Sequence, residues 1–149
     1  MDTSNQIRHQ MIERITAQHP ETGADAAINL WEQMAAQIIA IVGEGGFNSL
    51  YARSVFLTRS TFPWLASTSL PPEADHRFAG LKASLEGQSP AQASAANRLL
   101  LMSFTDILAT LIGERLTRSI LHLAWDSEKL LAGNLNNASD SGVKELKNG

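Results

Sequence analysis

The chain is similar to itself at a spacing of 70 residues, and this internal similarity constrains the fold more than any other feature. Aligned without a gap, Gly43-Glu44 falls on Gly113-Glu114. Apolar residues also fall on apolar residues, as in the pairs Leu30 and Leu100, Met34 and Phe104, and Ile38 and Leu108. A repeated unit typically buries its apolar face against its own copy. The register therefore predicts two three-helix repeats related by a pseudo-twofold axis. Amphipathic helices in register produce part of this agreement by themselves, so the duplication is a hypothesis.

Apolar residues recur at helical spacing through most of the chain, and no segment shows the alternating pattern of a strand. The sequence therefore predicts an all-α fold, a compact bundle of about six helices. We expect these helices over residues 4–18, 20–42, 47–59, 72–85, 90–112 and 114–131. Gly43 suits the left-handed conformation that ends many helices. Ser89-Pro90-Ala91-Gln92 is typical of a helix start.

The length of 149 residues fits a single domain, which we place at residues 1–133. Within it, the first repeat covers about 4–61 and the second about 72–131. Residues 60–72 contain three prolines and are interpreted as the linker between the repeats. Residues 134–149 are small and polar, and we predict that they form a disordered tail.

Composition excludes several classes of function. The net charge of −3 gives no reason to expect nucleic acid or an anionic membrane as a partner. The absence of cysteine excludes a disulfide framework and a thiolate nucleophile. The first residues are polar, unlike a signal peptide, and the longest apolar run, over 99–112, is short for a membrane span. We expect a cytoplasmic protein.

No group of residues forms a recognisable catalytic or metal-binding pattern, so we predict a non-enzymatic protein without a cofactor or a metal. His9 and Glu13 are four residues apart on a helix, a spacing more typical of a surface pair than of a metal site. The Gly43-Glu44-Gly45-Gly46 segment follows a helix rather than a strand, which argues against a phosphate-binding loop. Glu44 and Glu114 each begin a helix, where a carboxylate interacts favourably with the helix dipole.

Two further polar residues stand out. Asp106 interrupts the most apolar segment, and a carboxylate is costly to bury alone. We expect it to face an arginine such as Arg53 or Arg98; the alternative is that it lines a pocket. His122 shares a polar stripe with Arg118 and Asp126, which indicates a set of surface ion pairs.

Phe62-Pro63-Trp64-Leu65 is the one concentrated apolar loop of the sequence. One interpretation is a lid over the edge of the core. The other is a docking patch, because exposed aromatic residues often anchor partners. Phe62, Trp64 and Leu65 are therefore the candidate partner-binding residues.

Three functions remain open. We favour a regulatory module that binds another protein or itself, as a dimer or other homo-oligomer, with exposed apolar area near the linker or the helix over 114–131. The second is a sensor or carrier of a small apolar ligand, with a pocket between the repeats. The residues expected around that pocket are Trp31, Met34, Phe104 and Trp125. The third is a phosphotransfer protein, which requires an exposed His76 on a helix.

Overall fold

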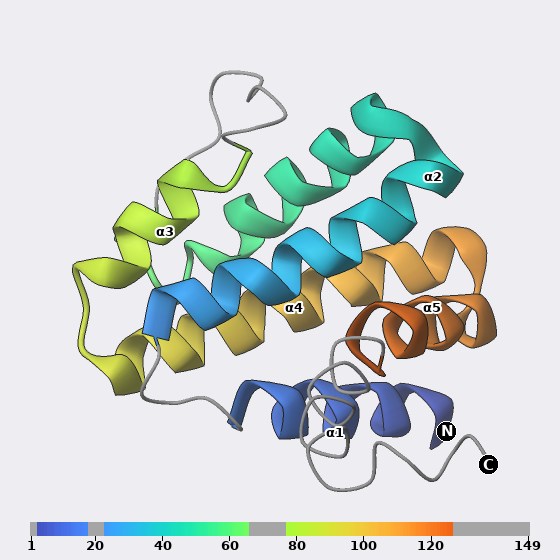
Figure 1. Cartoon of the computed structure of the whole chain (residues 1–149), viewed down its shortest axis with the longest axis horizontal. Helices are drawn as coiled ribbons and strands as arrows, with labels where there is room; N and C mark the ends of the chain where they lie inside the picture. Colours follow the sequence, from blue (N-terminus) through green and yellow to red (C-terminus); the bar gives the residue numbers. More distant parts are fainter. Residues whose placement is uncertain (1–2, 18–22, 66–76, 127–149) are drawn as a thin grey trace, which may run out of the picture.

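The computed structural model describes residues 3–17, 23–65 and 77–126, and in these residues the fold is all-α without a strand (Figure 1). The all-α prediction is therefore confirmed. The elements are α1 (Thr3–Ala17), α2 (Gly23–Thr58), α3 (Ala79–Glu86), α4 (Pro90–Ile112), α5 (Glu114–Leu121) and a π-helix, η2 (His122–Asp126). There are thus five α-helices in the described residues where about six were expected, because the two helices predicted over 20–42 and 47–59 are the arms of α2.

Two glycines turn the chain at its corners. Gly43 breaks α2 into a first arm (23–42) and a second arm (44–58), and Gly113 separates α4 from α5. Their backbone angles are similar, with φ 84° and ψ 166° at Gly43 and φ 99° and ψ 152° at Gly113. The positive φ expected at Gly43 is confirmed, whereas its ψ differs from the value of about +47° of the left-handed helical conformation. The observed region of backbone angles is nearly restricted to glycine. Glycine is therefore required more strictly here than in the left-handed helical conformation, which asparagine also adopts.

Helix α4 begins as the sequence predicts. Ser89 is extended, its Oγ accepts a hydrogen bond from the backbone N–H of Gln92 at 3.2 Å, and Pro90 occupies the first turn. Helix α3 is shorter than predicted, since it starts at Ala79. Residues 72–76 of that predicted helix, with His76, and the predicted tail at 134–149 lie outside the described residues.

Aromatic rings from several helices form the centre of the core. The ring centroid of Trp31 lies 5.3 Å from those of Tyr51 and Phe104 and 5.7 Å from that of Phe78. The Nε1 of Trp31 donates a hydrogen bond of 2.8 Å to Oδ1 of Asn97, which satisfies the one polar atom of the indole. These rings join both arms of α2 to α4 and to the residue that precedes α3.

The first arm of α2 and helix α4 run side by side from one end of the molecule, and the corners at Gly43 and Gly113 lie at the opposite end (Figure 1). Helix α4 contacts α1, α2, α3 and α5, as expected for the most apolar segment of the chain. Helix α1 packs against α4 and α5, whereas α3 packs chiefly against α2.

Burial follows the 70-residue register. Buried residues of α2 fall on buried residues of α4, α5 and η2: Leu30, Met34, Ile38, Leu50, Tyr51 and Val55 on Leu100, Phe104, Leu108, Ile120, Leu121 and Trp125. Exposed Ile41 falls on exposed Leu111 in the same way. The agreement is compatible with two related halves. The duplication itself and its pseudo-twofold axis stay a prediction.

Candidate interaction surface

The four residues expected around a ligand pocket lie inside the packed core. Trp31, Met34, Phe104 and Trp125 are all buried, and the indole Nε1 of Trp125 donates to the backbone oxygen of Leu30 at 3.2 Å. Their side chains contact one another and their neighbours in the core cluster.

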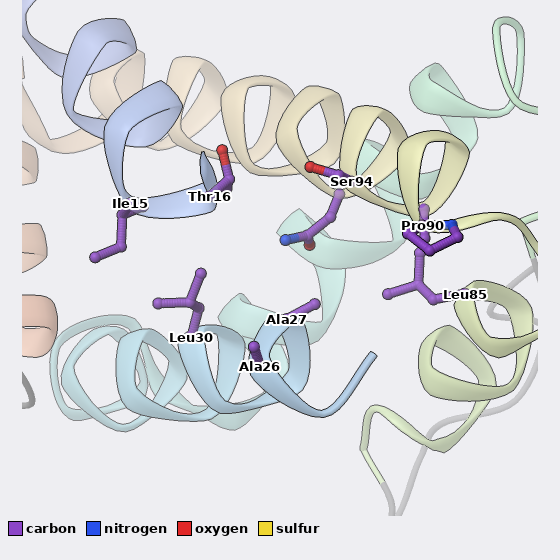
Figure 2. Close-up of a pocket in the computed structure, with 10 residues that line it drawn as sticks. Ile15, Thr16, Ala26, Ala27, Leu30, Leu85, Pro90 and Ser94 are labelled. Carbon is purple, nitrogen blue, oxygen red and sulfur yellow. The ribbon is translucent and has the colours of Figure 1, made fainter. Parts of the chain in front are cut away.

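A small pocket lies beside this core, where the end of α1 meets the starts of α2 and α4. Figure 2 shows Thr16 and Ser94 on one side of this pocket and Leu30 and Ala27 on the other. Its volume is about 30 Å³, enough for a water molecule. A shallow groove of about 200 Å³ lies elsewhere, between the first arm of α2 and Phe78. Both are smaller than the roughly 300–1,000 Å³ typical of small-molecule sites.

The candidate partner-binding residues of the linker lie at the edge of the core. Leu65 is buried, and Phe62 and Trp64 are half-buried and pack against the core cluster. The two rings contact each other edge to face with centroids 5.7 Å apart. This placement favours the lid interpretation, and docking through these residues stays a prediction.

A polar network centred on Arg8 joins α1 to α4 and α5. The side chain of Arg8 is 2% exposed. Its Nε donates to Oε2 of Glu114 at 2.6 Å, and its Nη1 donates to Oδ1 of Asp106 at 2.7 Å and to Oγ1 of Thr105 at 2.8 Å. Burial by itself lowers the pKa of Arg8, but the hydrogen bonds and charges of Glu114 and Asp106 outweigh it. The net pKa is raised, and Arg8 stays charged.

This network corrects the predicted partners of two residues. Asp106 does face an arginine, but this arginine is Arg8 rather than Arg53 or Arg98. His9 does not pair with Glu13; its Nε2 lies 2.8 Å from Oδ1 of Asp106. The described residues contain no group of three His, Asp or Glu side chains that is placed to hold a metal. Every charged group in the network binds another group of the network. The network therefore serves best to hold α1 against the bundle.

A second arginine binds the other corner glutamate. Arg77, which precedes α3, donates from Nη2 to Oε2 of Glu44 at 2.8 Å, and its guanidinium lies 5.5 Å from the ring centroid of Phe47. The hydrogen bond from Arg77 lowers the pKa of Glu44. Glu44 and Glu114 therefore each hold an arginine from a distant segment, in addition to the dipole role expected from their position.

Apolar side chains are exposed on several elements of the described chain. Seven large ones are more than a third exposed: Ile7, Ile41, Phe56, Leu57, Leu111, Leu116 and Leu123. Leu116 and Leu123 are seven residues apart, about two turns of a helix, so they lie on the same side of α5 and η2. Both leucines therefore face solvent, although leucine is more often buried.

We define the α5 face as the five exposed residues Arg115, Leu116, Ser119, His122 and Leu123. The opposite side of the same segment is buried: Thr117, Ile120, Leu121, Ala124 and Trp125. Leu116 is 43% exposed and Leu123 is 59% exposed. The segment thus has two apolar edges, and only one of them packs into the bundle.

The arginines of this segment have no acceptor among the described residues. Neither Arg115 nor Arg118 forms a hydrogen bond or an ion pair there, and the Nε of Arg118 is buried without a partner. Because this atom is closed to solvent, another molecule can reach only the more exposed parts of Arg118, whereas Arg115 is an exposed cation.

The segment ends in the π-helix η2, a rare conformation that is frequent at functional sites. It keeps Trp125 buried while Leu123 points to solvent. The predicted set of surface ion pairs among Arg118, His122 and Asp126 is incomplete, because Arg118 has no acceptor in the described structure. The side chain of Asp126 lies outside the described residues.

Two helices have the length and composition of membrane spans: the most apolar 18-residue window has a mean hydropathy of 1.2 within Ala24–Thr58 and 1.4 within Pro90–Ile112. Both segments are longer than the apolar run over 99–112, which by itself is short for a membrane span. The core helices of water-soluble proteins pass the same test, and both segments supply many of the buried residues of this bundle. The cytoplasmic location stays a prediction.

No family model, curated protein or solved structure matches this chain.

Proposed function

We propose that this protein is a non-enzymatic interaction module and that it binds another protein through the α5 face. The observation that carries the proposal is the pair Leu116 and Leu123, which are exposed on one side of a helix whose other side is buried in the bundle. Burying an exposed leucine completely contributes about 1.5–3 kcal/mol. Two leucines two turns apart are a common anchor for helix packing.

The other two functions have less support. A carrier needs room for its ligand, and the cavities described here have volumes of about 30 and 200 Å³. A phosphotransfer role depends on His76, which lies outside the described residues. The α5 face also agrees with the expectation of exposed apolar area on the helix over 114–131.

The partner can be identified by cross-linking in the native cell. A photoreactive amino acid replaces Ser119, which lies on the α5 face between the two leucines, and the cross-linked protein is identified by mass spectrometry. Its affinity is then measured with purified components by isothermal titration calorimetry.

We expect the variant L116A/L123A to bind this partner at least about fivefold more weakly, because interface anchors typically contribute more than about 1 kcal/mol. Phe56→Ala is the matched control, since Phe56 is 69% exposed on the second arm of α2, outside the α5 face. Equal binding by the wild type and L116A/L123A would refute the α5 face as the docking surface.

A further inference from the structure

The charges around Leu116 and Leu123 indicate what kind of partner fits the α5 face. Arg115 is exposed beside Leu116, and Arg118 follows one turn later. Neither guanidinium group has an acceptor among the described residues. The neighbouring carboxylate, Glu114, already binds Arg8. The cationic side of this segment therefore has no counter-charge from the described residues.

We infer that the partner segment is an acidic amphipathic helix; this inference rests on the proposed function of the α5 face. Apolar residues of such a helix, spaced over two turns, cover Leu116 and Leu123. Its Asp or Glu side chains then reach Arg115 and Arg118. Carboxylates suit guanidinium groups because they accept charge-assisted hydrogen bonds, which are roughly twice as strong as neutral ones.

A second copy of this chain fits the surface less well. Symmetric pairing through the α5 face places Arg115 of both copies in one interface without an acidic residue, and like charges across an interface oppose association. A face-to-face homodimer also provides no carboxylate for Arg118, because the α5 face contains none.

An anionic membrane surface fits less well for a different reason. An interfacial helix inserts its apolar side into the lipid. The broad apolar side of α5 and η2 is buried against the bundle, with Ile120, Leu121 and Trp125 all inaccessible. Two leucines at its edge offer little area for insertion, whereas they are sufficient to anchor a single helix.

The test uses the full chain and two designed helical peptides. Both peptides carry leucines at a spacing of seven residues along one side. In the acidic peptide glutamates flank the leucines, and in the basic peptide lysines replace those glutamates. Binding is followed by the amide chemical shifts of the isotope-labelled protein, which detect weak complexes and report where they form.

We expect the acidic peptide to shift the amides of residues 114–126, and we expect the basic peptide to bind more weakly or not at all. Added salt should weaken the acidic complex, because exposed charges are screened. Arg115→Ala should weaken it about two- to fivefold, the effect of one exposed ion pair. Arg53→Ala, on the second arm of α2, is the matched control and should leave the affinity unchanged.

Other results would separate the two proposals. If both peptides bind equally at the α5 face and L116A/L123A abolishes both complexes, the interaction surface stands and its preference for acidic partners is wrong. If neither peptide binds, the acidic-helix inference is refuted, while the cross-linking of position 119 decides the interaction surface independently. If anionic vesicles shift residues 114–126 and the acidic peptide does not, the partner is a membrane and the inference is overturned.

Discussion

Replacing Arg8 by methionine should destabilise the fold by about 1–3 kcal/mol, because the substitution removes the cation that joins α1 to α4 and α5. Arg8 makes hydrogen bonds to Glu114, Asp106 and Thr105, and its side chain is 2% exposed. Breaking a fully buried ion pair costs about 3–5 kcal/mol. The expected value is lower here, since the carboxylates left behind are 25% exposed in Glu114 and 48% exposed in Asp106 and recover water. Methionine fills much of the volume of the arginine stem, so a cavity contributes little.

The free energy of unfolding is measured by urea denaturation, followed by circular dichroism at neutral pH. Arg77→Met is the matched control. Arg77 also binds a corner glutamate, but its partner Glu44 is 52% exposed, so the expected loss is smaller than in Arg8→Met. A double variant, R8M/E114Q, should recover part of the stability lost in Arg8→Met, because it relieves the repulsion between Glu114 and Asp106. Equal losses in Arg8→Met and Arg77→Met, or a loss below about 0.5 kcal/mol in Arg8→Met, would refute the reasoning.

Three further predictions concern the corners, the core and the linker. Gly43→Val and Gly113→Val should each destabilise by about 1–3 kcal/mol, from backbone strain alone, because a Cβ there meets no atom within 4 Å; the control Gly45→Ala, at a helical position, should stabilise slightly in the same urea titration. Tyr51→Phe should make the protein less sensitive to alkaline unfolding: burial raises the pKa of Tyr51 above its ordinary value of 10.0, so the native state of the wild type keeps its proton and loses stability as the pH rises above 10. Equal pH midpoints of alkaline unfolding in the wild type and Tyr51→Phe would contradict the raised pKa of Tyr51. Trp64→Ala should cost about 1–3 kcal/mol in thermal unfolding, less than a fully buried aromatic, because Trp64 is half-buried; an unchanged melting temperature with lost partner binding would instead support docking by the linker.

The sequence alone determined the all-α class, the positions of the two corners and the buried sides of the longest helices. The apolar spacing of Leu30, Met34 and Ile38 defines a buried side whatever that side packs against, because a helix repeats every 3.6 residues. Gly43 and Gly113 mark the corners because few other residues adopt a positive φ. These properties depend on near neighbours in the chain, and near neighbours are visible in a sequence.

The tertiary structure decided which helices pack their buried sides against each other. Arg8 shares the inward side of α1 with Ile12, and this spacing of four residues was the available signal for its burial. Nothing in the local pattern shows that its partners are Asp106 and Glu114, about a hundred residues away. The same limit applies to Leu116, which has the composition of a core residue and becomes exposed because α5 buries Ile120 and Leu121 instead. Periodicity gives the direction of a side chain on its own helix, whereas contact and exposure depend on where the other helices lie.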